Sequence, residues 1–274
     1  MTEINELIER IPALPDVKKI EPLIGGAVNE TYRLFCDSGS LILRRDTPLA
    51  AVLGLDRQTE IDVLTVAADR GLGPTVIWAD PDAGLLLTEY QEGHSWREAD
   101  LHNKKNLGRI GKLLQRLHQV PIDAKPVDLS RYACRYAQQL ATDEADRIAR
   151  EAGKLADKWC AENSRHVLCH NDPIAGNIIE TKENDRLVLI DWEYAGLGEP
   201  CFDLAVVIRH HVLSVADTRI FLDAYGVVDE VRLEGCMALY DRLSVLWLMV
   251  ICAHTDATPA TWAALEAAIS RLNH

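Results

Sequence analysis

The order of strand-like and helix-like segments in the first ninety residues is the feature that most limits how this chain can fold. Runs of β-branched and apolar residues bounded by turn residues indicate strands, and apolar residues at helical spacing indicate helices. The predicted order is helix, three strands, helix and two strands, at residues 2–11, 17–24, 31–36, 41–45, 56–70, 76–79 and 85–90. We therefore expect a five-stranded antiparallel sheet with one inserted helix.

Gln91-Glu92-Gly93 ends this pattern, and we interpret it as the connection to a second part of the protein. Beyond it, apolar residues recur at helical spacing over about 99–119, 129–162 and most of 200–272. A hairpin of two short strands, from His166 to Trp192, interrupts these helices. The expected fold is α+β, with a small N-terminal lobe (1–90) and a larger, mainly helical C-terminal lobe (91–274).

Composition narrows the possible partners and the compartment. Hydrophobic residues make up 48% and the formal net charge is −13, which argues against nucleic acid or an anionic membrane surface as a partner. The seven cysteines are scattered without a C-x-x-C pair, as expected for reduced thiols. The acidic start of the chain lacks a secretory pattern, and the apolar run 245–251 is too short to span a bilayer. We expect a cytoplasmic protein of undetermined oligomeric state.

The interrupting hairpin carries three polar residues at a specific spacing. Asn177 follows Asp172 by five residues, and Asp191 lies fourteen residues further on, after an apolar strand. Asp172 can accept the proton of an attacking hydroxyl, while Asn177 and Asp191 offer the oxygen ligands that Mg²⁺ prefers. The combination H-x-D-x-x-x-x-N followed by strand-Asp indicates phosphoryl transfer.

The segment His170-Asn171-Asp172 with Asn177, together with Leu189-Ile190-Asp191-Trp192-Glu193-Tyr194-Ala195-Gly196, resembles the aminoglycoside phosphotransferase and choline kinase superfamily. The resemblance covers nearly the whole chain and is strongest to bacterial choline kinase-like and thiamine kinase-like members. It implies a two-lobed protein-kinase-like fold with ATP and Mg²⁺ as cofactors. It also implies that Asp172 is the catalytic base and that Asn177 and Asp191 are the metal ligands. His170 and Asp203 would support the catalytic loop.

The same resemblance assigns the cation that holds the ATP phosphates. Arg44, on the third strand, matches the family position, and Arg45 is the alternative if the strand register differs by one residue. Glu60 resembles the acidic partner of this cation, although an exposed helix carboxylate is the plainer interpretation.

Two further segments are expected to contact ATP. Gly25, Gly26 and Asn29 match a shortened phosphate loop, with an ordinary hairpin turn as the alternative. The backbone around Glu89 and Tyr90 is expected to bind adenine.

The acceptor is assigned to residues beside and after the hairpin. Trp192, Glu193, Tyr194 and Trp247 are the candidate acceptor-binding residues, because aromatic rings and carboxylates hold quaternary ammonium groups. A core position is the alternative for Trp247, because a Trp in an apolar helix more often packs in the core. The family often has a second Trp near this position, which this chain lacks, and that departure argues against choline. Choline is the first candidate acceptor, with thiamine, ethanolamine or an amino sugar as alternatives. A non-catalytic nucleotide-binding module and a plain scaffold are the hypotheses from other classes.

Overall fold

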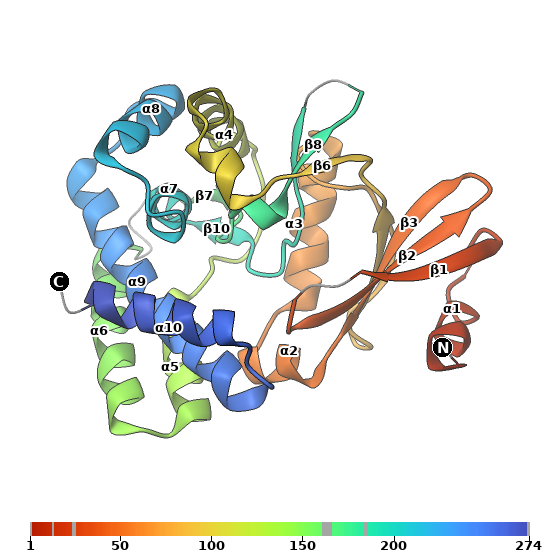
Figure 1. Ribbon diagram of the computed structural model, residues 1–274, viewed down its shortest axis with the longest axis horizontal. Helices are drawn as coiled ribbons and strands as arrows, with labels where there is room; N and C mark the ends of the chain where they lie inside the picture. Colours follow the sequence, from red (N-terminus) through yellow and green to blue (C-terminus); the bar gives the residue numbers. More distant parts are fainter. Residues whose placement is uncertain (1, 13, 24–25, 161–165, 184–185, 273–274) are drawn as a thin grey trace.

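The computed structural model describes residues 2–12, 14–23, 26–160, 166–183 and 186–272. A twisted sheet lies on one side of the molecule and a helical body on the other, with helix α3 between them (Figure 1). Gly25 of the predicted phosphate loop lies outside the described residues.

The sheet of the N-terminal part has five antiparallel strands, as predicted, and their order in the sheet is β1-β2-β3-β5-β4. Its strands and the helices before and within it are α1 (Thr2–Ile8), β1 (Val17–Leu23), β2 (Asn29–Cys36), β3 (Gly39–Asp46), α2 (Pro48–Leu53), α3 (Arg57–Asp69), β4 (Val76–Asp80) and β5 (Leu85–Glu89). The sequence prediction missed α2. This helix is too short to show an apolar period, and it depends on local signals: a Thr47 cap, Pro48 in its first turn and a left-handed Gly54 at its end.

Strand β3 presents alternate side chains to two environments. Leu43 is fully buried with Leu34 and Leu87 in a small core that α1 covers. Because successive side chains on a strand point to opposite faces, Arg44 faces away from that core and into the cleft. The register of this strand therefore decides which arginine lines the cavity between the sheet and the helices.

The segment that connects the lobes contains a short strand, which pairs with the hairpin. Strand β6 (Gly93–Ser95) pairs antiparallel with β8 (Ile178–Thr181), which pairs with β9 (Leu187–Leu189). A Cβ atom at Gly93 would lie 2.2 Å from the carbonyl oxygen of Glu180, so glycine permits this close approach. The strands β8 and β9 of the predicted hairpin thus belong to a three-stranded sheet in which β8 is the central strand.

The remaining chain is mainly helical, as predicted. Its other elements are η1 (Glu98–His102), α4 (Lys104–Leu117), α5 (Leu129–Leu140), α6 (Asp143–Trp159), β7 (Val167–Cys169), η2 (Ala175–Asn177), β10 (Gly196–Gly198), α7 (Pro200–His210), α8 (Val215–Tyr225), α9 (Glu230–His254) and α10 (Pro259–Leu272). The helix expected from residue 99 is divided into η1 and α4, because Asn103 caps a new helix by accepting the N–H of Lys105.

Helix α9 is longer than the apolar run in the sequence suggested. Among the described residues it alone is long and apolar enough to cross a membrane, and 44% of its most apolar window is buried within the protein. It packs against α5, α6, α7 and α10 (Figure 1). We interpret it as the central helix of the larger lobe, which explains its apolar composition without a bilayer.

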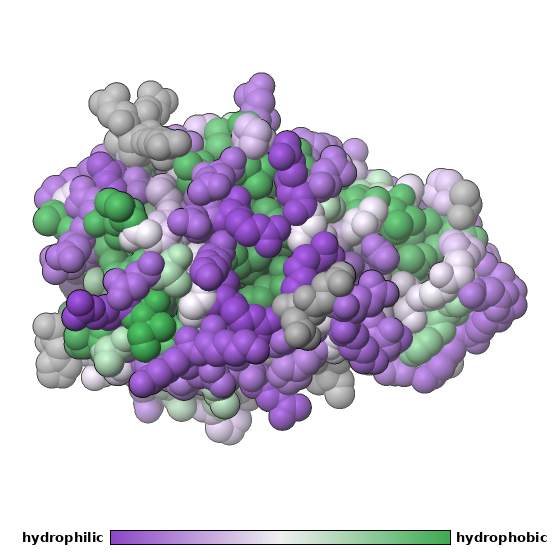
Figure 2. All heavy atoms as spheres, turned by 90° about the horizontal axis from the view of Figure 1, so that it is seen from above, coloured by the Kyte–Doolittle hydropathy of each residue, from purple (hydrophilic) through white to green (hydrophobic). Residues whose placement is uncertain are grey.

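The face seen in Figure 2 is mostly hydrophilic, with hydrophobic residues gathered in separate patches.

Candidate active site

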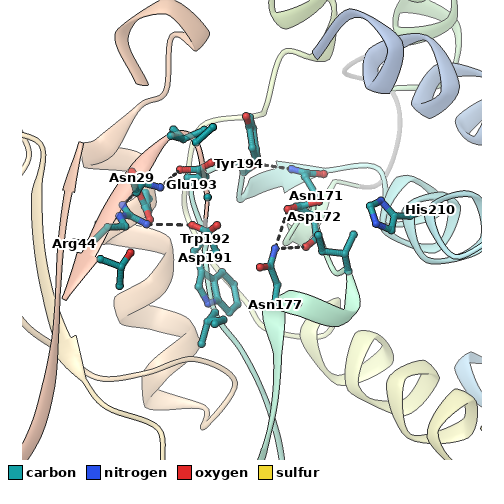
Figure 3. A pocket seen from close by; sticks show the side chains of 18 of the residues that line it. Asn29, Arg44, Asn171, Asp172, Asn177, Asp191, Trp192, Glu193, Tyr194 and His210 are labelled. Carbon is teal, nitrogen blue, oxygen red and sulfur yellow. Dashed lines mark hydrogen bonds and ion pairs between the residues drawn. The ribbon is translucent and has the colours of Figure 1, made fainter. Parts of the chain in front are cut away.

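The loop that follows β7 carries the predicted base and one predicted metal ligand in direct contact. The Nδ2 atom of Asn177 donates to Oδ2 of Asp172 at 2.8 Å and to its carbonyl oxygen at 3.0 Å (Figure 3). The amide oxygen of Asn177 has no hydrogen-bond partner among the described residues and is available as a ligand.

The backbone of this loop is held from two sides, as predicted for His170 and Asp203. Asp203, in the first turn of α7, accepts the backbone N–H groups of His170 at 3.0 Å and Asn171 at 2.6 Å. The ring of His170 contacts the backbone N–H of Asp172 through Nδ1 at 3.3 Å and donates from Nε2 to the carbonyl of Ile190 at 3.0 Å. His170 therefore joins the loop to the strand end before Asp191, and burial lowers its pKa, which keeps it neutral.

Burial makes Asp172 a stronger proton acceptor than an ordinary carboxylate. Desolvation, together with the nearby charge of Glu193, raises the pKa of Asp172 to about 7, against the opposing hydrogen bond from Asn177. A general base works best when its pKa lies near the working pH.

Arg44 joins the two parts of the protein at the cleft. Its Nη2 atom lies 2.6 Å from Oε2 of Glu60 on α3, which is the predicted ion pair. Its Nη1 atom lies 3.3 Å from Oδ1 of Asp191. Arg45, the alternative, pairs with Glu30 instead. The structure therefore places Arg44, and not its neighbour, at the site.

Asp191 follows Ile190 with a left-handed backbone, φ 62°, which is unusual for a residue other than glycine. Burial raises the pKa of Asp191 despite the neighbouring Arg44. Its carboxylate and the unpaired oxygen of Asn177 form a set of hard oxygen donors that fits Mg²⁺.

The structure corrects the assignment of Glu193 to the acceptor pocket. Its Oε2 atom accepts hydrogen bonds from Asn29 Nδ2 at 2.8 Å and from Arg57 Nη1 at 3.2 Å, so the carboxylate faces the N-terminal lobe (Figure 3). Arg57 was missed from the sequence. It is buried and also bonds Glu60 at 2.8 Å and Asn29 at 2.8 Å. Asn29 thus sits on the phosphate-loop side, held by two charged residues.

The structure also corrects the assignment of Trp192 to the acceptor pocket. Its indole is 1% exposed, packs edge-on against His170, and donates from Nε1 to the Leu189 carbonyl at 2.9 Å. A ring enclosed in this way cannot present its face to a quaternary ammonium group. Trp192 instead packs beside the strand end that precedes Asp191.

One cavity of about 1200 Å³ extends from the N-terminal sheet to the helices of the larger lobe. Apolar residues line its nucleotide half: Val28, Ile42, Leu64, Leu86, Ile179 and Ile190. Glu89 and Tyr90 border it, but their backbone N–H groups already bond Thr75 and Ser40 at 2.9 and 3.1 Å. Adenine recognition would therefore use their carbonyl groups or the following residue.

Aromatic side chains gather in the other half of the cavity. Trp247 donates from Nε1 to the hydroxyl of Tyr194 at 3.0 Å, and Tyr132 packs edge-on against Tyr194 with ring centroids 5.8 Å apart. Tyr136 and Tyr240 also line this half. Tyr194 and Trp247 thus contact each other at the cavity wall, and Trp247 also packs against the hydrophobic core. Tyr132 and Tyr136 were missed; their four-residue spacing on a helix was the available signal.

The charged groups of the aromatic half are mostly paired. Asp241 is buried and bonds Arg209 through two oxygens, at 3.1 and 2.5 Å. Arg271, from α10, lines the cavity and lies 3.4 Å from the same carboxylate. Among the described lining residues of this half, Asp172 is the carboxylate without a cationic partner.

A five-stranded lobe joined to a helical lobe, with Asp172, Asn177 and Asp191 where they meet, defines a small-molecule phosphotransferase with a kinase-like fold. The chain belongs to the phosphotransferase enzyme family, whose model matches residues 19–242.

Individual relatives agree with this membership. LicA of Haemophilus influenzae is 28% identical over 211 residues, which cover 74% of this chain and 61% of that protein, so the match spans about three fifths of the relative. The choline kinase LicA from Streptococcus pneumoniae has a TM-score of 0.83 over 100% of this chain and 99% of that chain, at 21% identity. A spectinomycin phosphotransferase solved with ADP and spectinomycin has a TM-score of 0.62 over 97% of this chain and 93% of that one, at 14% identity. At these identities the two solved structures establish the fold alone.

Proposed function

We propose that this protein transfers the γ-phosphate of ATP to a hydroxyl group of a small cationic metabolite, with choline as the first candidate. One observation supports this most directly. Asp172, with its pKa raised to about 7, lies on the floor of a cavity that has a nucleotide half on one side and an aromatic half on the other.

The residues divide the work of an in-line transfer. Asp172 accepts the proton of the acceptor hydroxyl and orients its oxygen toward the γ-phosphate. Arg44 forms an ion pair with Glu60 and binds the ATP phosphates through its guanidinium group. Asn177 and Asp191 would hold Mg²⁺, which when bound neutralises the phosphate charge. Asn29 and Gly26 cover the phosphates from the opposite side of the cleft.

The aromatic half supports a cationic acceptor. Ring faces stabilise an ammonium group that cannot donate hydrogen bonds, and Tyr132, Tyr194 and Trp247 line the same cavity as Asp172. Two of the similar proteins named above are LicA proteins, and one of these is named a choline kinase. Thiamine, ethanolamine and an amino sugar remain the alternative acceptors of the same site.

The experiment that tests the proposal is a coupled ADP-release assay with choline, ethanolamine, thiamine and amino sugars, with and without Mg²⁺. We expect ADP release that requires both Mg²⁺ and one of the cationic acceptors, and formation of the phosphorylated acceptor by mass spectrometry. Nucleotide binding without turnover on any acceptor would instead favour the non-catalytic module.

The proposal includes two statements about the whole molecule. The boundary between the nucleotide lobe and the acceptor lobe lies after residue 90. The protein works in the cytoplasm, where the seven cysteines, all free in the structure, would stay reduced.

A further inference from the structure

His211 is a buried histidine that the proposed mechanism does not use. It follows the last turn of α7 and is 2% exposed. Its Nε2 atom lies 3.2 Å from the backbone nitrogen of Ala175, and its Nδ1 atom lies 2.7 Å from Oε2 of Glu98 on η1. A ring nitrogen that accepts an N–H cannot carry a hydrogen, so Nδ1 must be the protonated nitrogen that donates to Glu98.

Helix α7 therefore contacts the catalytic loop at both of its ends. Asp203, in the first turn, accepts the N–H groups of His170 and Asn171, on one side of Asp172. His211, at the other end, accepts the N–H of Ala175, which lies between Asp172 and Asn177. The base is thus placed between two backbone attachments to a single rigid helix.

We propose that His211, with Glu98 fixing its tautomer, is a positioning residue that sets the distance between Asp172 and Asn177. The inference rests on the proposed function, because it concerns the base and the metal ligand of that reaction. The Ala175 N–H lies in the turn that separates them, and a buried N–H without an acceptor would favour a shifted loop.

A metal site is the competing interpretation of this cluster, since ligand atoms of Glu98, His210 and His211 lie within 4.8 Å of one another. The hydrogen bonds argue against it. Nε2 of His211 accepts from Ala175 and Nδ1 donates to Glu98, so the ring has no lone pair left for an ion. His210 is engaged separately, with Nδ1 3.0 Å from the hydroxyl of Tyr240.

The test compares two substitutions of His211 that differ in one property. His211→Gln keeps an acceptor at a similar reach and a donor for Glu98, while His211→Leu keeps the size of the side chain and removes both. We expect His211→Leu to lower kcat about tenfold to a hundredfold, with KM for ATP and acceptor within about twofold, and His211→Gln to recover most of the loss. His102→Gln is the matched control, because His102 lies 3.6 Å from the other oxygen of Glu98 and is half-exposed.

Hydrogen–deuterium exchange of the peptide that covers residues 170–178 gives a readout that does not depend on the acceptor. Faster exchange there in His211→Leu, but not in His211→Gln, supports the inference, provided that thermal melts show both variants folded. Equal activity and equal exchange of the two variants would overturn it, as would a loss confined to KM. If the wild-type protein phosphorylates no acceptor, the proposed function fails while the exchange comparison still decides the role of His211.

Discussion

The guanidinium of Arg44 lies between two carboxylates, 2.6 Å from Glu60 and 3.3 Å from Asp191. Glu60 lies on α3 and is buried, while Asp191 comes from the other lobe and is a proposed metal ligand. The guanidinium of Arg44 thus contacts both the buried carboxylate of Glu60 and the carboxylate of Asp191, which the proposed mechanism assigns to Mg²⁺. Substituting it should affect stability and nucleotide binding together.

We predict that Arg44→Gln raises KM for ATP about tenfold or more and lowers the melting temperature, because Glu60 loses a partner in a buried site. Arg45→Gln is the matched control on the opposite face of the same strand, where the arginine pairs with Glu30 near the surface. Steady-state kinetics and thermal melts check both variants. Equal effects of the two substitutions would contradict the assignment of Arg44.

Replacing the base should separate activity from stability. Asp172→Asn is expected to lower kcat by at least about a hundredfold, since the amide cannot accept the hydroxyl proton. The pKa of Asp172 rises from its ordinary 3.8 to about 7 on folding, so the native state binds more protons than the unfolded state between these values. Stability from this group is therefore present at low pH and is lost as the pH rises through about 7.

It follows that Asp172→Asn should melt above the wild-type protein at pH 8 without Mg²⁺, because the ionised carboxylate is costly in its partly buried position near Glu193. The difference should shrink as the pH falls toward 5. Calorimetry at several pH values checks this, and a gap that widens on acidification would show that the sign is wrong.

The position of Trp247 in the wall of the cavity predicts that this tryptophan contributes to acceptor binding. Trp247→Leu removes a ring face and the hydrogen bond to Tyr194, so we expect KM for a quaternary ammonium acceptor to rise about tenfold while KM for ATP stays within about twofold. Trp262→Leu, at an exposed position on α10, is the control and should change neither value. A Trp247 variant with an unchanged acceptor KM would place the acceptor elsewhere.

Arg271 brings a positive charge to the half of the cavity proposed to bind a cation. We predict that Arg271→Gln lowers KM for cationic acceptors a few-fold, because it removes a like charge while Arg209 still pairs with Asp241. The effect should weaken as salt is added. Arg219→Gln, far more exposed on α8, controls for net charge. A higher KM in the Arg271 variant would indicate that this residue binds the acceptor directly.

The apolar patterns of the sequence were enough to predict the five-stranded antiparallel sheet, because each strand depends on a local pattern of residues. The pairing of Arg44 with Glu60 and the contacts of Asp203 with the catalytic loop were expected only from the resemblance to a known family. Their members lie 16 and 33 positions apart, so no local pattern could indicate them.

The sequence could not show which way side chains turn after Asp191. Trp192 and Glu193 were both assigned to the acceptor, yet one is enclosed beside His170 and the other bonds Asn29 across 164 positions of the chain. The role of Arg57 was not predicted for the same reason, because its partners come from three separate segments. Such long-range pairing depends on how the lobes meet, which no local pattern encodes.

The ladder between β6 and β8 bears on how the cleft can open. Lys182 bonds the Glu92 carbonyl at 3.1 Å, and Gly93 pairs with Thr181, so the end of the connecting segment moves as one piece with the hairpin that follows Asn177. Tyr90 in turn donates its backbone N–H to the carbonyl of Ser40 on β3, so the connecting segment is attached to both lobes, on either side of Gln91. The residues proposed to border adenine would therefore stay close to the proposed metal ligands when the cleft opens.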